Sequence, residues 1–232
     1  MSLVPLVLLP GMMCDARLFT HQIAVLSNSC PIHLAPINGH YSVQALAAEI
    51  LEHAPPRFAL AGLSMGGIVA MELIAQAPGR IDRLALMDTN PLAEQDKIKN
   101  LRDSLIKRVR DGSLRQVMQE ELKPRYLTSG PYLNQILALC LEMALDQGED
   151  VFVRQSRALQ NRPDQQDTLR RVQVPTLVLC GEDDQLCPLE RHQLMHDLIA
   201  GSKLKIIKAA GHLSTLEQPE AVAQALMDWL SM

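Results

Sequence analysis

Apolar residues follow two different spacings along the chain, and the two spacings alternate. Short, nearly continuous apolar runs predict buried β-strands, whereas segments with apolar residues every three or four positions predict amphipathic helices. The expected strands are 5–10, 30–37, 57–64, 81–89, 174–181 and 203–211. The expected helices between them are 15–27, 42–54, 65–77, 188–200 and 214–230. Strands separated by helices predict a parallel sheet with helices on both faces.

This alternation stops after the fourth strand and resumes before the fifth. From residue 92 to residue 163, helix formers and charged residues dominate, and no strong strand pattern occurs. We therefore expect an α/β core built from residues 1–91 and 164–232, with a mostly parallel six-stranded sheet, and an all-helical insertion at 92–163.

Candidate capping residues mark the starts of three expected helices. Asp15 and Ser42 directly precede helical patterns, as N-cap residues do. Ser214 and Glu217 have the spacing of a capping box, which predicts that the last helix begins there.

The amino-acid composition argues against several classes of partner and site. Hydrophobic residues make up 47% of the chain but aromatic residues only 3%, so the core must be aliphatic. The net charge is −4 and no polybasic tract is present, which argues against a nucleic-acid partner. The five cysteines are odd in number and include no C-x-x-C pair. This argues against a disulfide framework or a zinc site and predicts a reducing, cytoplasmic location.

Residues 1–13 are largely apolar, which raises the question of a targeting or membrane segment. The run lacks a basic region before it, and Pro5 and Pro10 interrupt it. It is also too short to span a bilayer, and no other segment approaches the required length. We expect it to form the first core strand.

Polar side chains with related chemistry follow three of the expected strands. Ser64 follows the third strand, Asp183 and Asp184 follow the fifth, and His212 follows the sixth. The carboxyl ends of parallel strands meet at one edge of a sheet, where active sites collect. A histidine activates a serine hydroxyl, and a carboxylate orients the imidazole. The order serine, acid, histidine is that of hydrolases with the nucleophile on a strand–helix turn.

The segment AGLSMGG, residues 61–67, distinguishes two interpretations of Ser64. Serine before a helix is commonly an N-cap. Here Gly62 and Gly66 stand two residues to either side of Ser64, where a sharp strand-to-helix turn leaves no room for side chains. The pattern therefore favours a nucleophile over a cap.

Two backbone N–H groups are candidates for stabilising an oxyanion beside Ser64. The Met65 N–H lies at the start of the next helix, and the loop after the first strand offers the Met12 N–H. We expect Leu63, Met12 and Met13, together with the insertion, to shape a mainly apolar substrate pocket. This chemistry needs no metal and no organic cofactor.

His192 and His196 lie four residues apart on an expected helix, a spacing that can bind a metal ion. The segment lacks the glutamate of H-E-x-x-H, and no third ligand is evident. We therefore expect a solvated helix face and no metal site.

Four stretches resemble the α/β-hydrolase family and fall at the expected strand ends. They are LLPGMMCD (8–15), GLSMGG (62–67), CGEDDQLCP (180–188) and AGHLSTLEQPE (210–220). The resemblance implies a serine hydrolase similar to small carboxylesterases that carry a lid, with residues 92–163 as that lid. Since the chain starts almost at its first parallel strand, it also implies a sheet without the family's N-terminal hairpin.

The resemblance also implies which aspartate faces His212, and it shows one departure from the family in the loop after the first strand. Only one of Asp183 and Asp184 can face His212, and the family pattern Gly-x-x-Asp-x-x-x-Pro implies Asp184. Asp88, which follows the fourth strand, is a third candidate acid, but we expect it to organise the turn into the insertion. Pro10 stands where many relatives carry a histidine before the loop glycine.

The expected reaction is hydrolysis of small-molecule carboxylic esters with small to medium, mainly apolar acyl groups, through an acyl-enzyme. The resemblance extends to short-chain carboxylesterases and to the carrier-protein methyl esterases of biotin synthesis. Residues 92–125 hold nine Lys or Arg against six Asp or Glu. This excess suits an acidic carrier protein or a carboxylate-bearing substrate, although an ordinary charged surface is the simpler explanation.

Two alternative functions are compatible with the same residues. One is a carbon–carbon hydrolase or lyase that resembles the menaquinone-pathway synthases. The other is a ligand receptor that retains the serine, histidine and acid without turnover. The sequence does not name the natural substrate, because a fold and a set of reactive residues serve many reactions.

Overall fold

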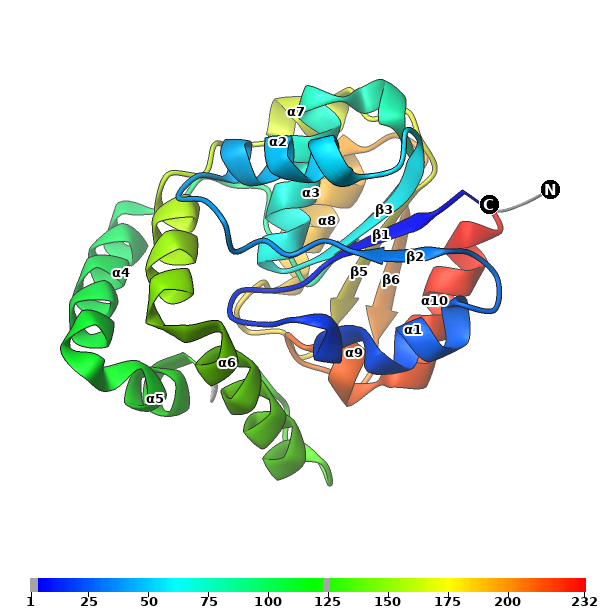
Figure 1. Cartoon of the computed structure of the whole chain (residues 1–232). Helices are drawn as coiled ribbons and strands as arrows, with labels where there is room; N and C mark the ends of the chain where they lie inside the picture. Colours follow the sequence, from blue (N-terminus) through cyan, green and yellow to red (C-terminus); the bar gives the residue numbers. More distant parts are fainter. Residues whose placement is uncertain (1–3, 123–125) are drawn as a thin grey trace.

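One six-stranded sheet forms the centre of the molecule in the computed structural model, which describes residues 4–122 and 126–232. The strand order is β2-β1-β3-β4-β5-β6, and all neighbouring pairs are parallel (Figure 1). The strands are β1 (Leu6–Leu9), β2 (Ile32–Leu34), β3 (Phe58–Leu63), β4 (Ile81–Met87), β5 (Thr176–Gly181) and β6 (Lys203–Ile207). The prediction of a six-stranded, mainly parallel α/β fold is confirmed.

Helices cover both faces of the sheet, which explains why the central strand β3 is buried and apolar at every position. Along β3, Phe58 and Leu60 enter the core on one face, and Ala59 and Ala61 enter the core on the other. The first face is covered by α2 (Val43–His53), α3 (Met65–Gln76), α7 (Gln166–Arg170) and α8 (Leu189–Leu198). The second is covered by α1 (Thr20–Leu26), α9 (Ser214–Glu217) and α10 (Pro219–Leu230).

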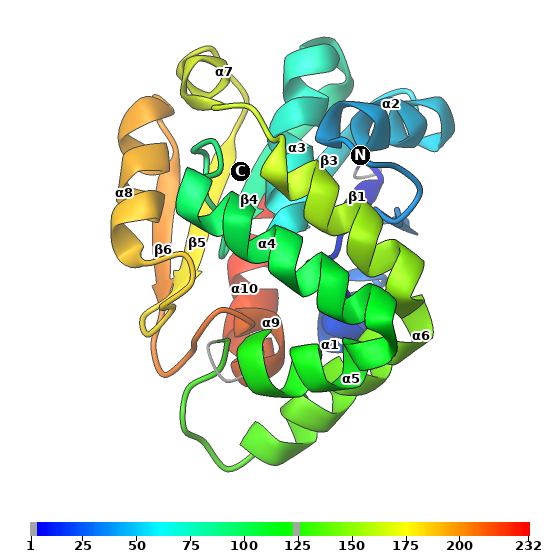
Figure 2. The same cartoon turned by 90° about the vertical axis from the view of Figure 1, so that its left-hand side faces the viewer.

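Between β4 and β5, the described residues form a group of helices outside these layers. They are α4 (Asp96–Arg108), α5 (Leu114–Val117) and α6 (Leu133–Gln160), called here the inserted helices. Two π-helical turns, Val109–Ser113 and Met118–Leu122, flank α5. The inserted helices gather on one side of the core, and α4 runs beside α6 (Figures 1 and 2). Gly148 bends α6, since its φ of 81° is a left-handed conformation that favours glycine.

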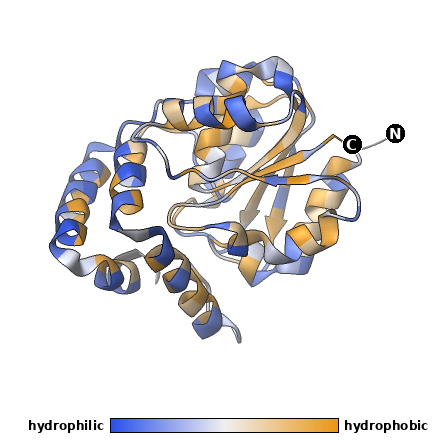
Figure 3. Cartoon of the chain, viewed as in Figure 1, coloured by the Kyte–Doolittle hydropathy of each residue, from blue (hydrophilic) through white to orange (hydrophobic). Residues whose placement is uncertain are grey.

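The hydropathy of the residues differs between the sheet and the helices that cover it. The strands are coloured mostly hydrophobic, whereas the helices carry hydrophobic and hydrophilic residues together (Figure 3). Among the described residues, no helix combines the length and the apolar character that crossing a membrane requires.

Two of the three candidate helix caps are confirmed. The Asp15 carboxylate accepts the Arg17 N–H at 2.9 Å, at the start of a short 3-10 helix (Ala16–Phe19) that precedes α1. The Ser42 hydroxyl accepts the Ala45 N–H at 3.2 Å at the start of α2. These side chains satisfy backbone donors that have no partner within the helix.

The last expected helix is two helices, because Pro219 begins a new one. Proline has no N–H to donate inside a helix but is tolerated at a first helical position. The capping-box prediction at Ser214 is wrong. The Ser214 hydroxyl donates to Asp88, and the Glu217 carboxylate accepts backbone N–H groups outside the helix.

Candidate active site

Ser64, His212 and Asp184 form one hydrogen-bonded chain at the carboxyl edge of the sheet. His212 Nε2 lies 2.8 Å from Ser64 Oγ, and His212 Nδ1 lies 2.8 Å from Asp184 Oδ2. Since a carboxylate only accepts hydrogen bonds, Nδ1 carries the proton and the Ser64 hydroxyl donates to Nε2. Asp184 is only 4% exposed, whereas its neighbour Asp183 is exposed to solvent. The structure therefore brings Asp184, and not Asp183, to His212.

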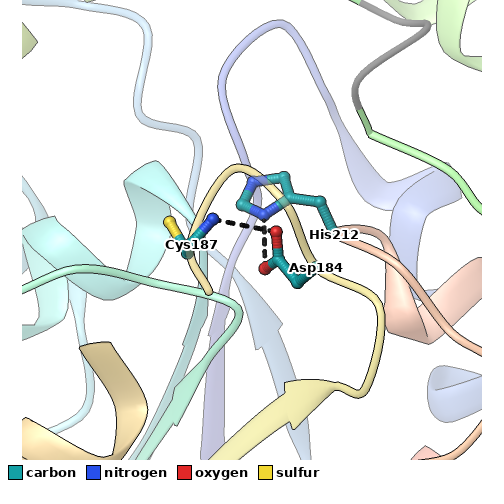
Figure 4. Close-up of side chains that lie close together, drawn as sticks. All are labelled: Asp184, Cys187 and His212. Carbon is teal, nitrogen blue, oxygen red and sulfur yellow. Dashed lines mark hydrogen bonds and ion pairs between the residues drawn. The ribbon is translucent and has the colours of Figure 1, made fainter. Parts of the chain in front are cut away.

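Both oxygens of the Asp184 carboxylate are held. Oδ1 accepts the Leu186 N–H at 2.9 Å. It also accepts the Cys187 N–H at 2.8 Å, while Oδ2 faces His212 (Figure 4). The two backbone donors come from the loop that leads from β5 to α8. This loop therefore fixes the carboxylate against the imidazole.

Electrostatics favour the protonated form of His212. Burial alone lowers the pKa of His212, but the charge and the hydrogen bond of Asp184 outweigh it, so the pKa lies above the ordinary value of 6.5. Asp88 and Glu217 raise it further. The Tyr126 ring packs against the imidazole, with ring centroids 5.5 Å apart. The surroundings of His212 therefore stabilise a positive charge on the imidazole.

Ser64 does not cap the helix that follows it. Its side chain accepts no hydrogen bond at the start of α3, and its φ of 55° and ψ of −115° lie outside the regions that non-glycine residues favour. The Ser64 N–H donates to Met87 O at 2.9 Å, and the Thr89 hydroxyl donates to Ser64 O at 2.7 Å. The end of β4 thus holds the strained turn that presents the hydroxyl.

Close backbone packing explains the two glycines that flank Ser64. A Cβ atom on Gly62 would lie 2.3 Å from Gly66 O, and a Cβ atom on Gly66 would lie 2.2 Å from Leu9 O. Neither obstacle is a side chain that could rotate away. These positions exclude any side chain, and this lets α3 begin directly against β1 and β3.

Two backbone N–H groups near this turn have no acceptor among the described residues. Met65 is the first residue of α3 and lacks an intrahelical partner, and the Met12 N–H lies in the loop after β1. The neighbouring Met13 N–H donates to Gln155 Oε1 at 2.8 Å, and Gln155 Nε2 donates to Ile37 O at 3.0 Å. Gln155 lies on α6 and is 1% exposed, so an inserted helix fixes the loop that carries Met12. No sequence signal singled out this glutamine.

Asp88, the third candidate acid, lies behind the hydrogen-bonded chain rather than in it. Its carboxylate accepts the Gly181 N–H at 2.8 Å and the Ser214 hydroxyl, and it is fully buried. Burial, and next the nearby Asp184 charge, raise the pKa of Asp88 to about 8. Asp88 therefore ties the ends of β4 and β5 together, beneath the loop that carries Asp184.

His192 is buried, and the prediction of a solvated face is wrong for this residue. His192 Nε2 accepts the Thr89 N–H at 3.0 Å, and its side chain is 0% exposed. Burial lowers the pKa of His192 to about 4, so the ring stays neutral and keeps its acceptor. His192 thus positions Thr89, which in turn binds Ser64 O.

A cavity of about 240 Å³ opens beside Ser64. Its charged lining residues are Glu94, Arg102, Arg162 and Arg191. Met13 and Leu63, the side chains expected to contact substrate, are 1% and 0% exposed and pack in the hydrophobic cores instead of on this wall. The wall is more polar than the pocket expected from the sequence, because the segment between β4 and β5 contributes Glu94, Arg102 and Arg162 to it, and α8 contributes Arg191.

Asp184, Cys187 and His212 place three potential metal ligands within 4.8 Å of one another (Figure 4). Both oxygens of Asp184 and both nitrogens of His212 are already engaged in hydrogen bonds. Burial raises the pKa of the Cys187 thiol well above its ordinary value, which opposes the thiolate that binds metals. These side chains are therefore better arranged for the hydrogen bonds that link Asp184, His212 and Ser64 than for binding a cation.

The α/β hydrolases share this arrangement. Their serine stands on a strained strand–helix turn of a parallel sheet, and the acid and the histidine follow at the ends of later strands. The model of the alpha/beta hydrolase family matches residues 6–225, and the chain belongs to this family.

Three relatives illustrate what most or nearly all of this chain is similar to. A thermophilic esterase from Thermogutta terrifontis, solved with malate bound, is 28% identical, with a TM-score of 0.90 over 98% of this chain and 89% of that one. The putative carbamate hydrolase RutD of Pseudomonas savastanoi is 25% identical over 205 residues, 85% of this chain and 78% of that protein. A pimeloyl-acyl-carrier-protein methyl ester esterase of Nitrosomonas europaea is 23% identical over 241 residues, 93% and 91% of the two chains. The family is shared, while the named reactions differ.

Proposed function

We propose that this α/β hydrolase cleaves carboxylic esters of small to medium acyl groups, with Ser64 as nucleophile, His212 as base and Asp184 as the acid that orients it. The observation that carries the proposal is the chain of two 2.8 Å hydrogen bonds from Ser64 through His212 to Asp184. The relatives named as esterase and as methyl ester esterase support the ester class.

The proposed reaction has two steps that use the same residues. His212 Nε2 takes the hydroxyl proton as Ser64 Oγ attacks the ester carbonyl carbon, and the Met65 and Met12 N–H groups stabilise the resulting oxyanion. The carbon–oxygen bond to the alcohol then breaks, and the alcohol leaves with the proton from His212. Water, deprotonated by His212, attacks the acyl carbon. The bond from that carbon to Ser64 Oγ then breaks, His212 returns the proton to Oγ, and the carboxylic acid is released. Asp184 stabilises the imidazolium in both steps.

We also propose that residues 92–163 act as a lid on the core formed by 1–91 and 164–232. The support is that α4 contributes Ile98 and α6 contributes Leu159 to the cavity beside Ser64. Substrate access then depends on the inserted helices. A small-molecule ester is the first substrate to test, and an ester linked to an acidic carrier protein is the second, because one named relative acts on a carrier-protein ester.

A fluorophosphonate probe tests the nucleophile directly. The wild-type protein is expected to gain one phosphonyl group, detected by intact-mass spectrometry and mapped to the peptide that contains Ser64. The Ser64→Ala variant is expected to stay unlabelled at the same concentration. A panel of p-nitrophenyl esters of increasing acyl length then measures hydrolysis that depends on Ser64. An unlabelled wild-type protein would refute the nucleophile, and labelling without ester hydrolysis would favour the lyase or the receptor.

Replacing Gln155 with leucine is expected to lower kcat for p-nitrophenyl esters about 10- to 100-fold, because loss of one oxyanion donor in other hydrolases costs at least that much. Leucine has a similar volume but cannot accept the Met13 N–H or donate to Ile37 O, so the loop that carries Met12 loses its tie to α6. KM should change much less than kcat, since the donor acts mainly on the transition state.

The matched control is Gln135→Leu, which changes an exposed glutamine on the same helix. It should keep the wild-type kcat. The Gln155→Glu variant retains the acceptor for Met13 and should recover part of the lost rate. Equal kcat values for Gln155→Leu and Gln135→Leu would contradict the assigned role.

A further inference from the structure

The cavity beside Ser64 is lined by an excess of positive charge. Its wall includes three arginines from three separate parts of the chain: Arg102 on α4, Arg162 after α6, and Arg191 on α8. Glu94 is the one carboxylate among the described residues of the wall. With three arginines and one glutamate, these described residues give the wall an excess of two positive charges. This concentration of charge points to an anionic ligand.

Glu94 binds two of the arginines at once and fixes their positions. Its Oε2 accepts a hydrogen bond from Arg102 Nε at 2.9 Å, and its Oε1 accepts one from Arg162 Nη2 at 3.1 Å. The Glu94 and Arg162 side chains are 6% and 7% exposed, and that of Arg102 is 17% exposed. A ligand therefore meets guanidinium groups that are already ordered, which reduces the entropy lost on binding.

Several guanidinium donors remain free after these pairings. Arginine has five N–H donors. Arg162 Nε donates to Leu92 O at 2.9 Å, but its Nη1 has no acceptor within the described part of the chain, and neither has Arg102 Nη2. Arg191 is half-buried, and its side chain has no acceptor there either. Buried charged donors gain most from a carboxylate, which accepts two of them side by side.

The three charges lie close to one another and to the proposed reaction centre. Besides burial, which lowers the pKa of Arg162, the charges of Arg102 and Arg191 lower it further, so the guanidinium groups repel one another. Arg102 Nη1 lies 3.7 Å from Met12 Sδ, next to the loop that holds the proposed oxyanion donor. Ser64 and Met65 line the same cavity. One small molecule can therefore reach Ser64 and the arginines together.

We propose that the preferred substrates are esters that carry a free carboxylate a few bonds from the scissile carbonyl, bound by Arg102, Arg162 and Arg191. This inference rests on the proposed ester hydrolysis at Ser64 and names its substrate class. The carboxylate lies on the acyl side in a hemiester of a dicarboxylic acid, or on the alcohol side in an ester of a hydroxy acid. A purely apolar ester would leave the free guanidinium donors unpaired when it displaces water from the cavity.

Paired substrates with the same number of carbon atoms test the charge preference. Monomethyl glutarate is compared with methyl pentanoate for the acyl side, and 3-acetoxypropionate with propyl acetate for the alcohol side. Wild-type kcat/KM is expected to favour the charged member of at least one pair about tenfold or more, since hydrogen bonds to charged groups are worth that much. The pair that shows the preference identifies the side that carries the carboxylate.

Three arginine variants assign the preference to the cavity. Arg102→Gln leaves Glu94 paired with Arg162, and Arg191→Gln breaks no pairing, so both should fold; thermal midpoints check this. Each is expected to reduce the charged-to-neutral ratio of kcat/KM about tenfold. Arg115→Gln changes an exposed arginine on α5 outside the cavity and should keep the wild-type ratio. An equal ratio in Arg102→Gln, Arg191→Gln and wild type would overturn the inference.

Failure of this inference is distinguishable from failure of the proposed function. If the wild-type protein is labelled by the fluorophosphonate and hydrolyses neutral esters without any charge preference, the carboxylate site is refuted and the ester hydrolase stands. If it hydrolyses no ester, calorimetric titration with monomethyl glutarate decides the site alone. Binding at least about tenfold weaker in Arg102→Gln would then support the site, and no binding by wild type would overturn it.

Discussion

Replacing Asp184 with asparagine is expected to lower kcat about 10⁴-fold, the loss seen when the acid of such a triad becomes an amide. The asparagine amide fits the same space but carries no charge, so it cannot stabilise the His212 imidazolium. Its NH₂ group can also face Nδ1, which favours the tautomer that places a proton on Nε2 and blocks acceptance from Ser64. Hydrolysis of p-nitrophenyl butyrate measures the loss.

The control is Asp183→Asn, which makes the same chemical change one position earlier. Asp183 is exposed, and its backbone N–H donates to Ala210 O in either variant, so wild-type kcat is expected. The pH profile adds a second readout. Wild-type kcat/KM should rise with pH through an apparent pKa above 6.5, because the neutral base is required and Asp184 raises the pKa of His212. In Asp184→Asn this limb should move to lower pH. Equal losses in the two variants would contradict the assignment.

Replacing Gly66 with alanine is expected to lower the free energy of unfolding by about 3 kcal/mol, at the upper end of the usual range for overpacking. The added Cβ would lie 2.2 Å from Leu9 O and 2.6 Å from Pro10 O, and both are backbone atoms that no rotamer change can move. Relief requires α3 to shift away from β1, which also displaces Ser64 from His212. Urea denaturation measures the stability, and the esterase assay measures the displacement.

Gly79→Ala is the matched control for added volume. Apart from its neighbours along the chain, no heavy atom of the described residues lies within 4 Å of the position where the Gly79 Cβ would stand. This variant should unfold within about 0.5 kcal/mol of wild type, as most surface substitutions do. If Gly66→Ala were as stable as Gly79→Ala, the close approach of α3 to β1 would not be what requires a glycine.

The sheet could be predicted from the sequence because a local run of apolar residues indicates a buried strand. The runs that form β3 and β5 are buried at all six positions, and Thr176 is the one polar residue among them. In a parallel sheet every strand ends at the same edge, so the positions of Ser64, Asp184 and His212 after their strands already implied that they lie near one another. Their hydrogen-bonded contact in the structure agrees with that reasoning.

Contacts between distant segments were beyond the reach of local patterns. Gln155 and Met13 are 142 positions apart, and a glutamine on a helix carries no mark of its partner. His192 was expected on a solvated helix face because its segment lacks the residues of a metal site, yet it is buried against Thr89. The polarity of the cavity likewise depends on how α4 and α6 pack on the core. Spacing along the chain does not encode this packing.

The bond between Gln155 and the loop after β1 has a consequence for engineering. Exchanging the inserted helices between related hydrolases is an obvious way to change which substrates enter. In this protein the exchange would also remove Gln155, whose side chain accepts the Met13 N–H, so a graft chosen for its pocket alone would leave the loop after β1 without that hydrogen bond. A successful chimera must carry an acceptor at that point of α6, and the exchanged segment and its recipient must therefore be designed together.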